Sequence, residues 1–303
     1  MVLRQLQTPT LNITYEDAGP PDGPVILLLH GWPDDIRGWS GVTPGLQAAG
    51  YRTLTPYLRG FGATSFRSAD TPRDGRGVAL VQDAMDLLDA LNVQRFAVVG
   101  HDWGARAAYG LAALIPERVT AVAALALAFQ PGGRFVLPDF SQSRQFWYQW
   151  FMTLDQGADA VRADPVGFAR IQWDTWSPAG WFSPTEFEQT ARSFQSEDWA
   201  EVTLSGYRSR WQDQRPDERH HDVRYDGVQQ RLAEVETIRV PTLMIQGGAD
   251  TCDEPASSAG LERHFLGRYQ RVVLNGVGHF PAREAPSLVT RALLTHLDTY
   301  SAL

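Results

Sequence analysis

Short apolar runs alternate with helical patterns over the first 130 residues. Two runs, 25–29 (VILLL) and 96–99 (FAVV), are apolar at every position, which is typical of strands in a parallel sheet that helices cover on both faces. Residues 78–91 carry apolar side chains at helical spacing between two of the runs, as a crossover helix does. The pattern predicts strands at residues 2–6, 11–16, 25–29, 52–56, 96–99 and 119–127.

This alternation stops after residue 130. Residues 131–233 show no clean strand pattern and are typical of short helices joined by Pro and Gly turns. They hold seven tryptophans, at positions 147, 150, 173, 176, 181, 199 and 211. Strand patterns return at 242–245 and 271–274, and a last helix is expected at 286–299. We predict an α/β core of residues 1–130 and 234–303, with a mostly parallel eight-stranded sheet flanked by helices, and an inserted helical cap region of residues 131–233.

The composition excludes some kinds of partner and site, but it does not indicate a function. The net charge of −8 argues against a nucleic-acid partner, because phosphate binding needs a basic face. No apolar run approaches the ~20 residues of a membrane helix, so no membrane partner is expected. Cys252 is the only cysteine, which excludes an internal disulfide and a cysteine-rich metal site. We predict a cytoplasmic protein, either a monomer or a homodimer.

Candidate chemistry first appears in the segment GHDWG, at residues 100–104, which joins the run 96–99 to a helical pattern. A sharp strand–turn–helix bend presents its central side chain to a cleft, and flanking glycines remove steric conflict in the bend. Asp102 is therefore a candidate nucleophile, although an aspartate that only caps the helix fits the same five residues. We interpret Arg106, one turn further on, as a structural ion-pair partner.

Three other segments end expected strands with polar or glycine-rich turns. The segment HGWPDD (30–35) follows VILLL, so the backbone N–H groups of Trp32 and Trp103 are the expected pair of oxyanion-hole donors. Asp250 ends the segment QGGAD, and His279 lies in NGVGHF. Asp253 and Glu254 are weaker candidates for the acid, because Asp250 follows its strand and turn directly. The carboxyl ends of parallel strands are where open α/β sheets place their sites.

These motifs, together with RGFGATS (59–65), resemble those of α/β-hydrolases of the epoxide hydrolase and haloalkane dehalogenase branch. The resemblance covers nearly the whole chain. It implies the α/β-hydrolase fold, a triad in the chain order Asp102, Asp250 and His279, and a reaction through an ester of Asp102. It also implies a small-molecule substrate and no need for a cofactor or a metal.

Residues of the cap region distinguish the subfamilies of this branch from one another. FWYQWF (146–151) and SGYRSRW (205–211) resemble the stretches in which epoxide hydrolases carry two tyrosines that hold and protonate the epoxide oxygen. Tyr148 and Tyr207 stand in those places, although aromatic residues in a Trp-rich region also serve as packing. An apolar or aromatic epoxide is the expected substrate. Its pocket is expected to be lined by Trp32, Trp103, Trp147 and Phe151.

Two other functions remain open at this point. A haloalkane or haloacetate dehalogenase would use the same Asp102, Asp250 and His279, and a non-catalytic relative could bind a small ligand in the same fold. A metal site at His220, His221 and Asp222 is not expected, because adjacent residues rarely converge on one ion and no partner motif is present.

Overall fold

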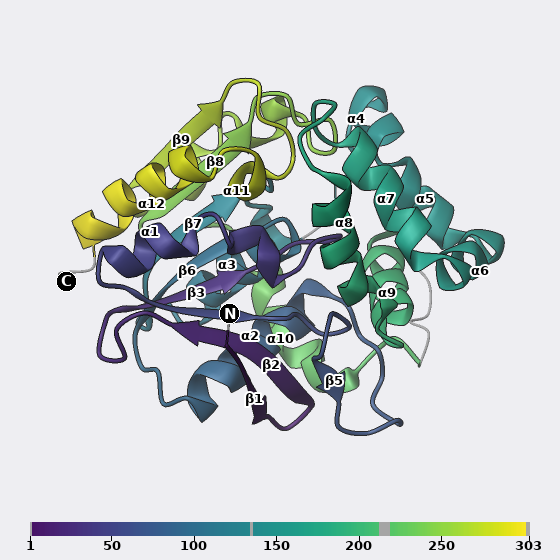
Figure 1. Cartoon of the computed structure of the whole chain (residues 1–303), viewed down its shortest axis with the longest axis horizontal. Helices are drawn as coiled ribbons and strands as arrows, with labels where there is room; N and C mark the ends of the chain where they lie inside the picture. Colours follow the sequence, from purple (N-terminus) through teal and green to yellow (C-terminus); the bar gives the residue numbers. More distant parts are fainter. Residues whose placement is uncertain (1, 134–135, 212–218, 301–303) are drawn as a thin grey trace.

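The computed structural model describes residues 2–133, 136–211 and 219–300. One mixed sheet runs through the molecule in the order β1-β2-β4-β3-β6-β7-β8-β9, with β5 paired to β2 (Figure 1). The pairs β1/β2, β2/β4 and β2/β5 are antiparallel, and all others are parallel. The strands are β1 (Leu3–Gln7), β2 (Leu11–Ala18), β3 (Val25–Leu29), β4 (Arg52–Pro56), β5 (Ser65–Phe66), β6 (Phe96–His101), β7 (Val119–Leu125), β8 (Thr242–Gly247) and β9 (Tyr269–Leu274).

The mostly parallel sheet is confirmed, but the expected number of eight strands is wrong. The ninth strand is β5, in which Leu11 and Asn12 of β2 pair with Phe66 and Ser65. Two residues are too few to show an alternating pattern, and the sequence around them resembles a turn. All eight expected strands are present: β3 and β4 have the expected ends, and the others differ by at most two residues at either end.

Helices cover both faces of the sheet because successive strand residues point to opposite sides. In β3, Ile26 and Leu28 pack in one apolar cluster with residues of α12, while Leu27 and Leu29 pack in another with residues of α2 and α3. This two-sided burial explains why β3 is apolar at every position. The helices of the sheet layer are α1 (Thr43–Ala48), α2 (Gly77–Ala90), α3 (Trp103–Leu114), α10 (Asp226–Ala233), α11 (Pro281–Glu284) and α12 (Pro286–Tyr300).

Between β7 and β8 the chain forms a run of helices that gathers at one side of the sheet (Figure 1), although the two strands themselves pair. These helices are α4 (Phe140–Gln145), α5 (Trp147–Thr153), α6 (Asp155–Ala163), α7 (Pro165–Thr175), α8 (Pro184–Ala191) and α9 (Trp199–Trp211). The boundaries of the cap region stay a prediction, and its residues 134–135 and 212–218 lie outside the described residues. None of the helices described has the length and apolar character needed to cross a membrane.

Candidate active site

Asp102 lies in a tight bend between β6 and α3, with φ 47° and ψ −111°. Such positive φ is rare outside glycine and costs on the order of 1–3 kcal/mol, so the surrounding structure must enforce it. The flanking glycines permit the bend: a Cβ on Gly100 would lie 2.1 Å from the carbonyl oxygen of Gly104, and a Cβ on Gly104 would lie 2.1 Å from that of Leu29. The Asp102 side chain is thus held at the carboxyl end of the sheet, 5% exposed.

The loop after β3 brings a backbone donor to this carboxylate. The Trp32 N–H donates to Oδ1 of Asp102 over 2.9 Å. A Cβ on Gly31 would lie 2.6 Å from the Cβ of Asp102, so the preceding glycine allows this approach. Trp103 is the first residue of α3, and the first N–H groups of a helix have no partner within the helix. Both expected oxyanion-hole residues therefore adjoin Asp102.

His279 lies between two carboxylates. Its Nδ1 is 2.9 Å from Oδ2 of Asp250, and its Nε2 is 3.8 Å from Oδ2 of Asp102. Asp250 is oriented in turn by the N–H groups of Cys252 and Asp253, which donate to its Oδ1 over 2.8 and 3.0 Å. Within the described ranges, the buried Nε2 of His279 has no hydrogen-bond partner. It is thus available to a water molecule placed over Asp102.

The charges around His279 favour its protonated form. Burial lowers the pKa of His279, but the carboxylate of Asp250, with smaller contributions from Asp102 and Asp253, outweighs it and raises the pKa to about 9. Burial and the neighbouring Asp250 raise the pKa of Asp253 to about 7. His279 is therefore mainly an imidazolium at neutral pH, and Asp250 contributes most to this.

Two helices of the cap region bring tyrosines to the same place. Tyr148 on α5 and Tyr207 on α9 are 2% and 1% exposed, and their ring centroids lie 5.3 Å apart. Burial raises the pKa of both phenols well above 10, and the Asp102 charge adds to the shift. The Trp32 ring packs against both, at 5.6 Å from Tyr148 and 5.0 Å from Tyr207. The tyrosines are thus protonated, and both pack on Trp32, whose backbone N–H binds Asp102.

Gln149 is a neighbour of Tyr148 that sequence reasoning missed. Its Nε2 donates to the Tyr148 hydroxyl over 2.9 Å, and its Oε1 accepts from Arg210 and Trp211, each over 3.2 Å. Because both partners of Oε1 are donors, the amide must turn its NH₂ toward Tyr148. The Tyr148 oxygen then accepts one bond and keeps its own proton to donate. Only the position next to Tyr148 hinted at this role.

The remaining pocket residues differ in their placement. Trp147 is 40% exposed and packs on Phe151 and Phe168, so much of its ring faces solvent; the place of Trp147 and Phe151 in the pocket stays a prediction. Sequence reasoning missed Trp176, whose ring lies 4.8 Å from that of His279 and 5.0 Å from that of Tyr148. Its carbonyl also accepts from the His279 N–H over 3.2 Å. The seven tryptophans of the cap region carry no pattern that singles out Trp176.

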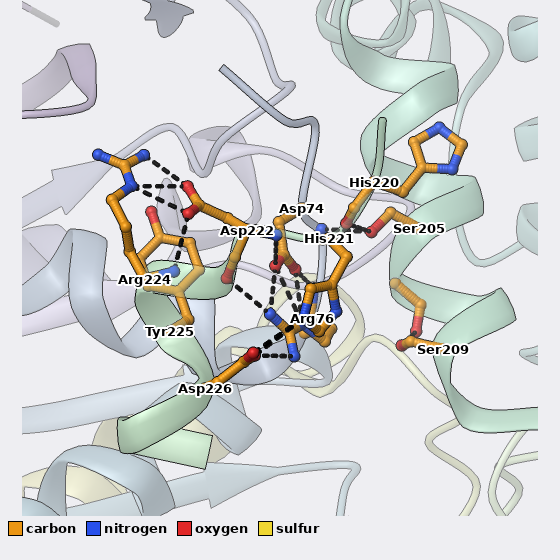
Figure 2. A network of polar contacts seen from close by, with 12 residues as sticks. Asp74, Arg76, Ser205, Ser209, His220, His221, Asp222, Arg224, Tyr225 and Asp226 are labelled. Atoms are coloured by element: carbon orange, nitrogen blue, oxygen red, sulfur yellow. Dashed lines mark hydrogen bonds and ion pairs between the residues drawn. The ribbon is translucent and has the colours of Figure 1, made fainter. Parts of the chain in front are cut away.

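Two interpretations outside the triad can be compared with the structure. His220 pairs with Glu201, and Figure 2 shows His221 and Asp222 within a network of ion pairs and hydrogen bonds. Among the described residues, no group of His, Cys, Asp and Glu side chains could hold a metal ion. The interpretation of Arg106 as an ion-pair partner is wrong, because across the described part of the chain its side chain makes no ion pair and its buried Nε has no hydrogen-bond partner.

Comparisons with known proteins agree with this architecture. A protein of Klebsiella pneumoniae, provisionally named an epoxide hydrolase, is 36% identical in sequence; its crystal structure matches with a TM-score of 0.90 over 97% of this chain and 96% of that one. Epoxide hydrolase A of Mycobacterium tuberculosis is 29% identical over 97% of this chain and 96% of its own length. The crystal structure of epoxide hydrolase A from Mycobacterium thermoresistibile, at 25% identity, has a TM-score of 0.77 with 98% of each chain covered.

The family profile described as alpha/beta hydrolase fold matches residues 24–286. This range contains every motif on which the resemblance was based, from HGWPDD to GVGHF. The expected fold and the resemblance are therefore confirmed, and the chain belongs to the alpha/beta hydrolase fold family.

Proposed function

We propose that the protein is an epoxide hydrolase that opens an epoxide to a vicinal diol through a covalent ester of Asp102. The observation that carries the proposal is the packing of two buried phenols, Tyr148 and Tyr207, on the ring of Trp32, whose backbone N–H donates to the carboxylate of Asp102. A carboxylate is a ready nucleophile at neutral pH, and the phenols supply protons to an oxygen that becomes an alkoxide. Relatives named epoxide hydrolases support the same small-molecule substrate class.

In the first step, an Asp102 oxygen attacks one epoxide carbon and the carbon–oxygen bond of the ring breaks. The electron pair passes to the epoxide oxygen, which takes a proton from Tyr148 or Tyr207. Hydrogen bonds from the phenols strengthen as negative charge develops there, so they stabilise the transition state more than the ground state. The products of the step are a hydroxyalkyl ester of Asp102 and a tyrosinate.

The second step needs neutral His279. The ester removes the negative charge of Asp102, one of the charges that keep the pKa of His279 near 9. The proton of His279 can then restore the tyrosinate, and the neutral imidazole takes a proton from water as the water attacks the ester carbonyl. The oxyanion is expected at the N–H groups of Trp32 and Trp103. Collapse releases the diol alkoxide, which takes the proton of the new Asp102 carboxylic acid and leaves the imidazolium in place.

A single turnover in H₂¹⁸O tests the covalent route. With enzyme in excess over styrene oxide, we expect ¹⁸O in the Asp102 carboxylate and unlabelled oxygen in the diol, because water attacks the carbonyl carbon of the ester. The measurement is mass spectrometry of the peptide containing Asp102 and of the diol. Label in the diol with none in Asp102 would exclude the ester.

The dehalogenase alternative shares Asp102 and His279 but needs donors for a halide. The indole N–H of Trp32 already donates to Thr203 over 2.9 Å, and a side-chain hydrogen bond links Trp103 to Tyr207. These contacts favour oxygen over halide as the leaving atom. Turnover of styrene oxide and an aliphatic epoxide, without halide release from a haloalkane or fluoroacetate, separates the two. The cytoplasmic location, the oligomeric state and the cap-region boundaries stay predictions.

A further inference from the structure

Two residues that follow α7 of the cap region, Trp176 and Ser177, reach the loops that carry the candidate acid and base. The Trp176 carbonyl accepts from the His279 N–H over 3.2 Å and from the Thr251 N–H over 3.4 Å. Thr251 directly follows Asp250 in the chain. The Trp176 ring lies 4.8 Å from the ring of His279. The cap region therefore contacts the core backbone beside both the acid and the base of the candidate triad.

A chain of two hydrogen bonds connects His279 to the carboxylate of Glu284 through Ser177. The His279 N–H donates to Oγ of Ser177 over 2.9 Å, and this hydroxyl donates to Oε1 of Glu284 over 2.7 Å. The N–H groups of Gly278 and Phe280 donate directly to Glu284 over 2.7 and 2.9 Å. Hydrogen bonds to a carboxylate are stronger than those between neutral groups. Glu284 therefore holds the backbone on both sides of His279, and Ser177 holds the residue itself.

Gly278 allows the cap region to approach this loop closely. A Cβ on Gly278 would lie 2.3 Å from Oγ of Ser177 and 2.5 Å from its Cα. In the core, a Cβ on Gly247, the last residue of β8, would lie 1.9 Å from the Gly278 carbonyl oxygen. Gly278 is thus packed between Ser177 and the end of β8, which explains why the residue before His279 carries no side chain.

The position of this backbone decides whether the imidazole of His279 can act. Its Nδ1 lies 2.9 Å from Oδ2 of Asp250, and its Nε2 lies 3.8 Å from Oδ2 of Asp102. A misplacement of about 1 Å between groups that must be aligned can cost on the order of 10²-fold in rate. Ser177 is 7% exposed, so solvent does not readily replace its hydroxyl. Loss of this hydroxyl should therefore loosen the placement of His279.

We propose that Ser177 and Glu284 are positioning residues for His279, and that the cap region thereby sets the rate of ester hydrolysis. The proposal rests on the proposed epoxide hydrolase function and adds the way in which the cap region acts on the base of that site. The first step needs no base, so its rate depends on Asp102 and the two tyrosines instead. Loss of the Ser177 hydroxyl should therefore slow the second step selectively.

Ser177→Ala, with Ser141→Ala as its matched control, tests the proposal. Ser141 makes the same kind of hydrogen bond, from the cap region to a core glutamate, but its partner is Glu254 at 2.7 Å. With enzyme in excess over styrene oxide, rapid quenching and mass spectrometry measure the formation and the decay of the Asp102 ester. We expect the decay to slow about 5- to 20-fold in Ser177→Ala, and the formation to change less than about twofold. Both rates should stay at wild-type values in Ser141→Ala.

Glu284→Gln tests the other end of the chain. The amide keeps the shape of the side chain but leaves one oxygen to accept the hydrogen bonds that two oxygens share. We expect the ester to decay more slowly than in Ser177→Ala. In the double variant the loss should be smaller than the product of the two single losses, because part of the effect of Glu284 passes through Ser177. A full product would overturn the chain through Ser177, and if Glu284→Gln does not fold, Ser177→Ala alone decides.

An NMR titration of His279 in the free protein gives a second measurement, which needs no substrate. Burial lowers the pKa of His279, while the charge and the hydrogen bond of Asp250 raise it to about 9. A loosened contact with Asp250 should lower the measured pKa by at least about half a pH unit in Ser177→Ala and leave it unchanged in Ser141→Ala.

Equal slowing of both steps in Ser177→Ala, or an unchanged decay of the ester, would overturn the proposal. If no epoxide is turned over, the proposed function fails, and the NMR titration then decides on the positioning of His279. A lower pKa in Ser177→Ala supports it, and a pKa equal to that of the wild type overturns it. Thermal unfolding of each variant shows whether the fold is retained.

Discussion

The core and the cap region hold their residues of the candidate site in position in different ways. Asp102 and Trp32 follow buried parallel strands, and close backbone packing at Gly31, Gly100 and Gly104 fixes their positions. Tyr148 and Tyr207 stand on separate helices, and their positions depend on rings packed against each other and on Trp32. A residue held by close backbone packing keeps its position when neighbouring side chains are substituted, whereas a residue held by ring packing shifts with its neighbours. The core is thus suited to fixed chemistry, and the cap region to the choice of substrate.

The strongest test of the core side is Asp102→Asn. Asparagine tolerates positive φ and keeps an acceptor for the Trp32 N–H, so the fold should be retained. Because the nucleophile is lost, we expect kcat to fall by at least about 10⁴-fold on styrene oxide. The measurement is steady-state diol formation, with circular dichroism as the control for folding. Activity within tenfold of wild type would show that Asp102 does not form the ester.

His279→Gln separates the two steps on the core side. The first step needs no base, so Asp102 should still be alkylated while hydrolysis slows by on the order of 10³-fold. Intact-protein mass spectrometry after mixing with styrene oxide should show the mass of one epoxide added. Unchanged turnover would contradict the role of His279, and slow turnover without the adduct would contradict the order of the steps.

The cap side is tested by replacing each phenol with a ring of the same shape. Tyr148→Phe and Tyr207→Phe remove a hydroxyl and keep the ring packing around Trp32. We expect each to lower kcat/KM for an epoxide about 10- to 100-fold, because one donor to the developing alkoxide is lost. Pre-steady-state alkylation rates are the measurement. If both variants alkylate at the wild-type rate, the tyrosines serve only as packing.

The pH dependence of ester hydrolysis tests how Asp102 and His279, both in the core, influence each other. His279 acts as a base only when neutral, so hydrolysis of the ester should rise about tenfold per pH unit until the pH passes its pKa and then level off. Because the ester lacks the Asp102 charge, the pKa measured for this step should lie below the value of about 9 in the free protein. Single-turnover rates from pH 5 to 10, compared with NMR titration of His279 in the free protein, test this. Equal pKa values would show that Asp102 does not influence His279.

Gln149 is expected to give the smallest of these effects. Gln149→Leu removes the donor to the Tyr148 oxygen, and Gln149→Glu, its matched control, keeps the shape but replaces that donor with an acceptor. We expect a loss of about three- to tenfold in the alkylation rate for Gln149→Leu and a larger loss for Gln149→Glu. In a Tyr148→Phe background, both substitutions should have little further effect. Additive losses there would show that Gln149 does not act through Tyr148.

Much of the core could be predicted because its signals are local. The run VILLL marks a strand buried on both faces, and GHDWG marks the bend that follows β6, since the conformation of a few adjacent residues decides both. The same local signal favours Asp250 over Asp253 and Glu254 as the acid, and the structure places Asp250 against Nδ1 of His279. The strand β5 was missed because two residues are too few to show an alternating pattern.

The sequence by itself determined the order of strands, turns and helices, and with it the residues that stand at the carboxyl ends of the strands. Only the tertiary structure decided which side chains contact one another at the carboxyl ends of the strands. It turned Trp147 outward, brought Trp176 onto His279, and left Arg106 beside a cavity instead of in an ion pair. Local backbone preferences are encoded in neighbouring residues, but contacts between helices depend on the packing of segments far apart in the chain. The bend at GHDWG could therefore be predicted from neighbouring residues, whereas the cavity along α3 could not.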